Sequence, residues 1–295
     1  MIKPDFKKIL ARIREIEIKI RKAVNAQTKG NFTSLFRGTG LEFDDVRTYQ
    51  YGDDIRHIDW HVSAKDENTY IKVFKEEKEQ TVFFLLDVSQ SQNLSTNEKS
   101  KIEVAKDICS VLALSAVKEA NEVGLLCFSD QKEKYIKPSK GMKKAYEVIL
   151  NLFRLTPISK KTNLNDFIKF ALNLIKRKSI VFLISDFLDD NYQDNLKALA
   201  KKHDLILIHL STEKEIKLPK LGIIPIFDLE TQTKHWINTS SVQFKKDLRE
   251  KFAAKKKELL ELVRKYQVNY LMVDTEEDFI PKLVKLFRTR NKNKK

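Results

Sequence analysis

The stretch Val82-Phe83-Phe84-Leu85-Leu86-Asp87-Val88-Ser89-Gln90-Ser91 decides the fold of this chain. Its apolar first half, with β-branched and aromatic residues, predicts a buried parallel strand that runs into a loop. In open α/β sheets, ligands bind just beyond the carboxyl ends of the strands. Asp87, Ser89 and Ser91 would lie there and offer one carboxylate and two hydroxyls. These oxygen ligands suit a hard cation such as magnesium, so the stretch predicts a metal site.

Predicted strands and helices alternate after this stretch. We expect strands at 82–88, 123–128, 180–184, 205–210 and 268–273, with a short strand pair within 223–238. We expect helices at 99–120, 142–153, 164–175, 192–201, 242–266 and 278–288. Strands separated by helices imply right-handed crossovers and a sheet covered on both faces. The expected fold class is therefore α/β, with a doubly wound, mostly parallel sheet.

The sequence before residue 79 has a different character. Apolar residues at helical spacing predict an amphipathic helix over 4–26, which would dock on the rest of the fold or lie on a membrane surface. Residues 30–68 are rich in turn residues, and Tyr70–Phe74 alternates like a strand. We therefore expect an N-terminal helix and extension over 1–78, an α/β domain over 79–290 and a basic tail over 291–295.

Composition favours a globular protein in a reducing compartment. The 42% hydrophobic content argues against disorder, and no apolar run approaches the roughly 18 to 20 residues of a membrane-spanning helix. The N-terminus lacks the apolar core of a secretion signal. Cys109 and Cys127 lie in apolar surroundings and show no metal or redox spacing. We expect a cytoplasmic protein, and the alternative is a cytoplasmic protein attached peripherally to a membrane.

Positive charge collects at the two ends of the chain. The formal net charge is +15, and Lys282–Lys295 contains seven Lys or Arg residues and no acid. Such ends can attract an anionic surface, whether nucleic acid, lipid or acidic protein. The commoner alternative is a solvated, frayed tail. No aromatic residue interrupts the last eight positions, so base stacking has no support there.

Two later loops could add oxygen ligands to the Asp87 stretch. Thr162 lies just before the helix expected at 164–175, and Asp186 ends the apolar strand expected at 180–184. Each has a structural alternative. Thr162 could cap its helix, and Asp186 could be a loop acid or the cap of the helix that begins near Tyr192. Both residues nevertheless fall at the end of an element where the carboxyl edge of the sheet is expected.

This arrangement resembles the metal-ion-dependent adhesion site of von Willebrand factor A domains. The resemblance implies five metal ligands, namely Asp87, Ser89, Ser91, Thr162 and Asp186. It also implies a divalent cation, magnesium before manganese or calcium, with one coordination position left for an acidic residue of a partner protein. Lys160 and Lys161 depart from the usual small residues before the threonine. They would weaken cation binding if they point inward and favour an acidic partner if they point outward.

A second motif lies upstream, in Gly52-Asp53-Asp54-Ile55-Arg56-His57-Ile58-Asp59-Trp60, preceded by Arg47-Thr48-Tyr49. Gly52 permits a turn, the arginines can pair with the nearby carboxylates, and the aromatic residues, with Phe43, can anchor the segment. A structural ion-pair network is the commoner interpretation, and acid–base catalysis is the alternative. The residues with an expected structural or partner-binding role are Arg47, Tyr49, Gly52, Asp53, Asp54, Arg56, Asp59 and Trp60.

This second motif resembles the bacterial family catalogued as domain of unknown function number fifty-eight. The resemblance covers Gly38 to Asp186 well and the C-terminal third by pattern alone. It implies a von Willebrand A-like domain encoded beside MoxR-type AAA+ ATPases. The implied role is a non-enzymatic partner or adaptor of such an ATPase, in protein remodelling or complex maturation.

Two other functions compete with this interpretation. An RNA-binding protein of the von Willebrand A class would use the basic ends of the chain. A magnesium-dependent hydrolase would use Asp87, but aspartyl-phosphate phosphatases need a second aspartate where this chain has Ser89. No Walker-type phosphate loop is present, and none of the five histidines has an obvious nucleophile partner. We therefore expect a metal-dependent interaction protein rather than an enzyme.

Overall fold

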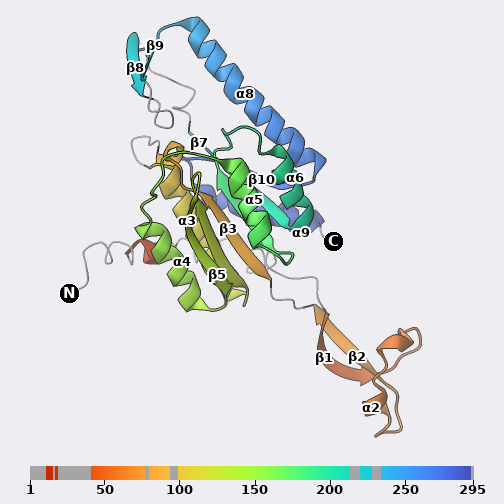
Figure 1. Cartoon of the computed structure of the whole chain (residues 1–295). Helices are drawn as coiled ribbons and strands as arrows, with labels where there is room; N and C mark the ends of the chain where they lie inside the picture. Colours follow the sequence, from red (N-terminus) through yellow and green to blue (C-terminus); the bar gives the residue numbers. More distant parts are fainter. Residues whose placement is uncertain are drawn as a thin grey trace, which may run out of the picture.

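The computed structural model describes residues 11–15, 17–18, 41–76, 80–93, 99–212, 220–227 and 234–293. A six-stranded sheet forms its centre, in the order β10-β7-β6-β3-β4-β5 (Figure 1). Neighbouring strands are parallel, except that β5 runs antiparallel to β4. The strands are β3 (Thr81–Asp87), β4 (Glu122–Phe128), β5 (Lys132–Ser139), β6 (Ile180–Ser185), β7 (Asp204–Ser211) and β10 (Asn269–Asp274). The predicted α/β class with a mostly parallel sheet is confirmed.

Helices cover both faces of this sheet (Figure 1). One face packs against α3 (Lys101–Lys118), α4 (Met142–Arg154) and α9 (Phe279–Asn293). The other face packs against α5 (Leu164–Leu174), α6 (Gln193–Lys202) and α8 (Val242–Lys265). Alternate residues of β3 point to opposite faces, so Phe84 belongs to the first apolar core and Phe83 to the second. This double burial explains why β3 is apolar at every interior position.

Local signals set the starts of the helices around the site. Ser100 caps α3 in a reciprocal capping box with Glu103. The Asn163 side chain accepts from the backbone N–H of Asp166 at the start of α5. The helices and strands predicted after residue 79 are all found, with ends shifted by a few residues. The expected strand pair is β8 (Ile223–Phe227) with β9 (Lys234–Asn238).

Two strands were missed by the sequence analysis. The edge strand β5 contains three lysines and a proline, so its pattern does not resemble a buried strand. The strand β1 (Leu41–Thr48) lies where only turns were expected, and acidic residues interrupt its apolar pattern. It pairs antiparallel with β2 (Tyr70–Glu76), the strand that was predicted from Tyr70. Neither β1 nor β5 has the apolar run that identifies a strand buried on both faces.

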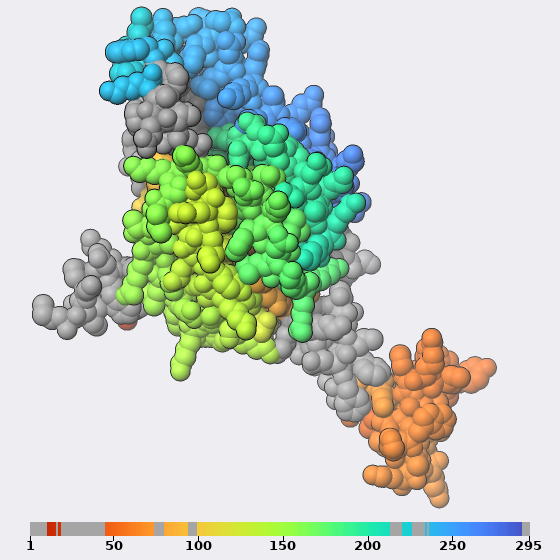
Figure 2. All heavy atoms as spheres, viewed as in Figure 1, coloured from red at the N-terminus to blue at the C-terminus, as the bar shows by residue number. Residues whose placement is uncertain are grey.

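The segment 41–76 forms an arm. Its β1–β2 ribbon is joined by η2 (Ile55–His57) and α2 (Trp60–Ser63). The arm stands apart from the main body in the ribbon view and in the space-filling view (Figures 1 and 2). The chain enters β3 after β2, so the arm is attached at the amino end of β3. The candidate metal ligands follow the carboxyl end of that strand.

The described part of the predicted N-terminal helix is helical and packs on the domain. Residues 11–15 and 17–18 are helical, and the rest of 4–26 lies outside the described residues. Ile13 is buried in the core shared with α3 and α4. Arg12 pairs with Asp107 of α3, and the Tyr146 hydroxyl of α4 donates to Glu17 Oε1 at 3.0 Å. This part of the helix therefore docks on the fold, as expected.

The C-terminal basic segment is helical as far as Asn293, beyond the end of the helix expected at 278–288, so residues 291–293 of the expected basic tail are part of a helix and the rest of that tail lies outside the described residues. The helix α9 runs to Asn293, and Leu283 and Phe287 are completely buried. Arg290 is also buried and pairs with Asp204. The apolar residues recur at helical spacing, so one stripe packs on the sheet while Lys285 and Arg288 face outward.

The two cysteines and the longest helices agree with what the composition predicts. Cys109 and Cys127 are both buried as free thiols. In the ranges that the structure describes, no helix has the length and apolar character needed to cross a bilayer.

Candidate metal centre

Asp87 is the last residue of β3, and its carboxylate accepts hydrogen bonds from three residues. Its Oδ1 accepts from the backbone N–H of Ser89 at 2.9 Å. Its Oδ2 accepts from Ser185 Oγ at 2.8 Å and from Gln92 Nε2 at 3.1 Å. The Ser89 and Ser91 hydroxyl oxygens lie 3.1 Å apart. The loop after β3 therefore gathers one carboxylate and two hydroxyls, as the sequence predicted.

Asp186 belongs to the same edge of the sheet. The strand β6 lies beside β3 and runs parallel to it, so the two carboxyl ends meet. Asp87 and Asp186 are 2% and 3% exposed, respectively. Burial, and then the nearby charge of Asp186, raise the pKa of Asp87 to about 6. Asp186 does not cap α6, whose N-cap residue is Tyr192.

Thr162 lies on a third loop that reaches the same edge. The carbonyl of Lys160 accepts from the backbone N–H of Gln90 at 3.1 Å, which joins this loop to the one after β3. Glu133 of β5 supports the loop by accepting from the backbone N–H groups of Ile158 and Ser159, at 2.9 and 3.0 Å. Asn163, and not Thr162, caps α5. The half-buried Thr162 is thus brought to the side of the Asp87 loop.

The two lysines before Thr162 are exposed. Lys160 and Lys161 therefore agree with the outward alternative, in which they favour an acidic partner. Both side chains therefore carry positive charge at the surface beside Thr162.

A different lysine enters the centre, and the sequence analysis missed it. Lys101 Nζ lies 2.6 Å from Asp186 Oδ2, and the two side chains are 0% and 4% exposed. Lys101 is the first residue of α3, where the positive end of the helix dipole disfavours a cation. A lysine directly after a capping serine was the available signal, because such a position needs a compensating acid.

Gln92 is a second residue that the sequence analysis missed. It is 1% exposed, and its Oε1 has no hydrogen-bond partner among the described residues. Its orientation is fixed because Nε2 donates to Asp87. A buried amide oxygen without a donor fits a cation or a water on that cation.

The donor set fits a hard divalent cation in its chemistry. The oxygens come from hydroxyls, an amide and two carboxylates. Within the described ranges, no three His, Cys, Asp or Glu side chains form a metal-binding group. The five residues predicted as ligands fall on three loops at one edge, and Asp186 already holds the Lys101 ammonium.

The upstream motif builds the turn of the arm. Arg47 donates from both terminal nitrogens to Asp53, each at 2.7 Å, and Arg56 pairs with Asp54 at 2.8 Å. Gly52 has a φ of 106°, which other residues rarely adopt. The Asp59 carboxylate accepts from the backbone N–H groups of His61 and Val62 and caps α2. The arm thus contains the ion pairs that the sequence predicted.

Trp60 corrects one expectation about this motif. Its side chain is 70% exposed and does not anchor the segment. Tyr51 and Ile55 are exposed as well, so three large apolar side chains face solvent on the arm. We call Tyr51, Ile55 and Trp60 the arm tip. Exposed aromatic residues on a separate arm are typical of a binding surface rather than of a core.

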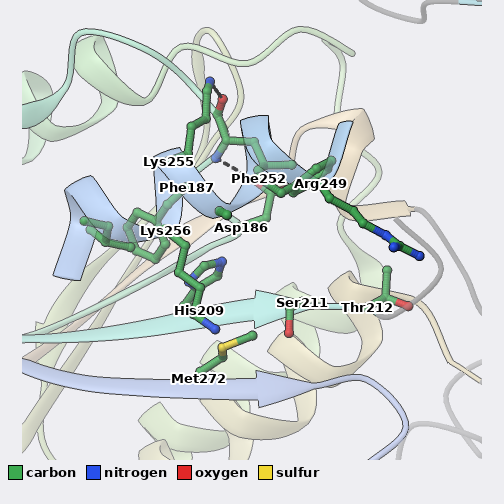
Figure 3. A pocket seen from close by; sticks show the side chains of 13 residues that line it. Asp186, Phe187, His209, Ser211, Thr212, Arg249, Phe252, Lys255, Lys256 and Met272 are labelled. Carbon is green, nitrogen blue, oxygen red and sulfur yellow. Dashed lines mark hydrogen bonds between the residues drawn. The ribbon is translucent and has the colours of Figure 1, made fainter. Parts of the chain in front are cut away.

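A cavity of about 350 Å³ lies beside Asp186 (Figure 3). It opens between α8 and the ends of β7 and β10, and its walls are mainly apolar, with Phe187, Phe252 and Met272 among them. His209 also lines it, and its Nδ1 lies 2.7 Å from the Tyr270 hydroxyl. Burial lowers the pKa of His209 to about 4, so the ring is neutral at neutral pH.

Comparison with known proteins gives the following findings. Residues 45–258 match the family described as "Protein of unknown function DUF58". A protein of Mycobacterium tuberculosis, Rv1480, is 21% identical over 291 residues, which cover 98% of this chain and 92% of that protein. Among solved structures, the chain is similar to BatB from Bacteroides thetaiotaomicron, with 16% identity and a TM-score of 0.45 over 72% of this chain and 99% of BatB. It is also similar to the SpRpn10 VWA domain, with 11% identity and a TM-score of 0.40 over 70% of this chain and 94% of that domain.

Proposed function

Because this chain belongs to the DUF58 family, we propose that it is a protein-interaction module of the von Willebrand A type. In this proposal the module binds an acidic side chain of a partner protein through a divalent cation at the Asp87 cluster. We define the Asp87 cluster as Asp87, Ser89, Ser91, Thr162 and Asp186.

The observation that supports this proposal is the convergence of three loops at one edge of the sheet. Ser89 and Ser91 bring their hydroxyl oxygens within 3.1 Å of each other, next to a buried Asp87. A magnesium ion, or manganese or calcium in its place, would supply a positive charge that a carboxylate of the partner can complete. Asp87 would hold the loop, and the exposed Lys160 and Lys161 would attract the acidic partner.

The proposed partner is a MoxR-type AAA+ ATPase, for which the chain would act as an adaptor. The resemblance of the upstream motif to its family suggests this class of partner. The arm offers a second contact surface, because Tyr51, Ile55 and Trp60 are exposed at its tip. The arm and the Asp87 cluster are attached at opposite ends of β3, so one partner or two could be bound together.

A capture experiment from the native cell tests both parts of the proposal. Wild-type protein and Ser89→Ala would be used as bait with magnesium and with chelator. Ser110→Ala is the matched control, since it removes a buried hydroxyl of α3 that donates to the Lys106 carbonyl, away from the Asp87 cluster. We expect an AAA+ ATPase with wild type and Ser110→Ala in magnesium, and its loss with Ser89→Ala.

The outcomes separate the two parts. Equal recovery with and without magnesium would remove the metal from the proposal and leave the interaction. Recovery of no AAA+ ATPase from any sample would remove the partner. Turnover of a phosphate ester that is lost in Asp87→Ala would favour the hydrolase, and steeply salt-dependent RNA binding would favour the RNA-binding alternative.

A further inference from the structure

We infer that Lys101 is a built-in competitor of the divalent cation, whose ammonium group holds Asp186 when the metal is absent. The inference rests on the proposed function and deepens it. It assigns Lys101 as the residue that sets how tightly this centre binds a metal ion.

The geometry gives Lys101 this role. Its Nζ lies 2.6 Å from Asp186 Oδ2, at the distance of a strong charge-assisted hydrogen bond. The Lys101 side chain is fully buried, so bulk water does not compete for the ammonium group. The other oxygen of Asp186, Oδ1, faces the backbone N–H of Leu188 at 3.4 Å. The carboxylate therefore lies between a protein cation and a protein donor.

The charge balance explains why a metal would compete. Two buried carboxylates, Asp87 and Asp186, lie at the carboxyl ends of the neighbouring parallel strands β3 and β6. Lys101 neutralises one of these two negative charges, so an entering divalent ion meets a weaker attraction. The ion also meets repulsion from the ammonium group and from the positive end of the α3 dipole. Metal binding is therefore coupled to displacement of Lys101 from Asp186.

The ion pair between Lys101 and Asp186 also stabilises the fold when no metal is bound. Without Lys101, Asp186 would be a buried charge with no cation beside it, which is strongly destabilising. In wild type the Lys101 ammonium group is the cation beside Asp186, so the cluster keeps its shape when no metal is bound. The Gln92 Oε1 atom beside the cluster is a buried acceptor without a hydrogen-bond partner among the described residues.

The test replaces Lys101 by a neutral side chain of similar length and measures metal binding directly. Magnesium would be titrated by calorimetry into wild type, Lys101→Met and Lys118→Met. Lys118 is the matched control, because it lies on the same helix, carries the same charge and is exposed. We expect the Kd for magnesium to fall by at least about tenfold in Lys101→Met and to stay unchanged in Lys118→Met.

The expected melting temperatures give a second readout. Lys101→Met should melt below wild type in chelator and recover in magnesium by more than wild type does. If Lys101→Met is unfolded in chelator, its folded fraction titrated with magnesium replaces the calorimetry. Recovery supports the inference, and no recovery up to about 20 mM magnesium overturns it.

The two proposals fail in different ways. If wild type binds magnesium and Lys101→Met binds it no more tightly, the competitor role is overturned and the proposed docking site remains. Binding by Lys101→Met alone supports the competitor role, and it removes magnesium-dependent docking by the wild-type protein. Binding by neither protein overturns both.

Discussion

Single side chains decide the electrostatics at the carboxyl edge of the sheet. Asp87 accepts hydrogen bonds from Ser89, Gln92 and Ser185, so its carboxylate is fixed before any ligand arrives. Such pre-organisation lowers the entropic cost of binding, because the ligating loop does not have to be ordered. The position of the Asp87 carboxylate is therefore set by the fold itself.

The first prediction concerns magnesium and thermal stability. At a magnesium concentration about ten times its Kd, the wild-type melting temperature should rise by about 3 °C. The rise should disappear in Asp87→Ala and Asp186→Ala, because each substitution removes a carboxylate of the cluster. Scanning calorimetry would measure the shift, with the exposed Asp166→Ala as the control. Equal shifts in all four proteins would contradict the assignment of the cluster.

The second prediction concerns His203 and pH. Its ring is 4% exposed, and neither ring nitrogen has a hydrogen-bond partner in the described part of the chain. Burial lowers the pKa of His203 from 6.5 to about 4, so the unfolded chain binds a proton more readily. The stability that this neutral histidine contributes is present above pH 6.5 and is lost as the pH falls towards 4.

The measurement for His203 is urea unfolding at pH 7 and pH 5. Between these values the wild type should lose about 1 to 2 kcal/mol through His203. The free energy of unfolding of His203→Phe should not show this loss between pH 7 and pH 5, because phenylalanine is also a planar ring and takes up no proton. The same loss in both proteins would show that His203 does not titrate in this window.

The residues of the site were predicted unevenly from the sequence. Asp87, Ser89 and Ser91 are adjacent in the chain, and their positions after an apolar strand were enough to place them together. Lys101 reaches Asp186 from a distant part of the chain, and Gln92 turns back onto Asp87 within its own loop, and the spacing of residues along the chain reveals neither contact. Their contacts depend on where α3 and η3 (Gln90–Asn93) begin, so the charge balance of the site could be seen only in the structure.

Among the elements, α3 couples the site to the core. Its first residue is Lys101 and its capping residue is Ser100, whose hydroxyl and backbone N–H both bond to the Glu103 side chain. The buried face of α3 then packs against α4 and the sheet. The position of the Lys101 ammonium group therefore depends on the first turn of this helix.

The third prediction concerns this capping residue. Ser100→Ala should lower the free energy of unfolding by about 1 kcal/mol, because it removes the side-chain acceptor for the N–H of Glu103. Ser100→Thr is the control and should lose only a few tenths of a kcal/mol, because threonine also caps helices. Chemical denaturation would measure both values. An alanine variant as stable as the threonine variant would show that the capping box contributes little here.

Helices and strands were predicted correctly where the sequence shows a single clear pattern of apolar residues. The strands β3, β6 and β7 are continuous apolar runs, and helices α4 and α5 have clear apolar stripes, so both types were predicted. The strand β5 alternates charged and partly buried residues at the edge, and β1 lies in a ribbon with no core of its own. The helix α9 was predicted to end at Arg288 rather than Asn293, because the sequence after Phe287 has no apolar residue to mark a further helical turn.

On the scale of the whole molecule, the arm and the α/β body are built differently. The body has an apolar core on each face of its sheet, whereas the arm depends on a two-stranded ribbon and exposed ion pairs. Exposed ion pairs contribute little stability, so the arm is held mainly by its ladder, turn and caps. The arm tip lies outside both apolar cores of the body.

The fourth prediction separates binding from stability. Trp60 on the arm and Trp236 on the β8–β9 hairpin are 70% and 71% exposed, so each is the matched control for the other. Neither Trp60→Ala nor Trp236→Ala should change the free energy of unfolding by more than about 0.5 kcal/mol. Capture of the AAA+ ATPase should fall only with Trp60→Ala. Equal capture by both variants would exclude the arm tip from the interface.

The charged edge strand β5 has a consequence for the behaviour of the protein at high concentration. An open sheet edge can recruit the strand of another molecule and begin aggregation. Here the last strand of the sheet contains Lys132, Lys134 and Lys137, and Pro138 has no N–H to donate. Two copies that approach through this edge would meet like charges and an interrupted ladder. The lysines and the proline of β5 thus disfavour pairing of two copies through this edge of the sheet.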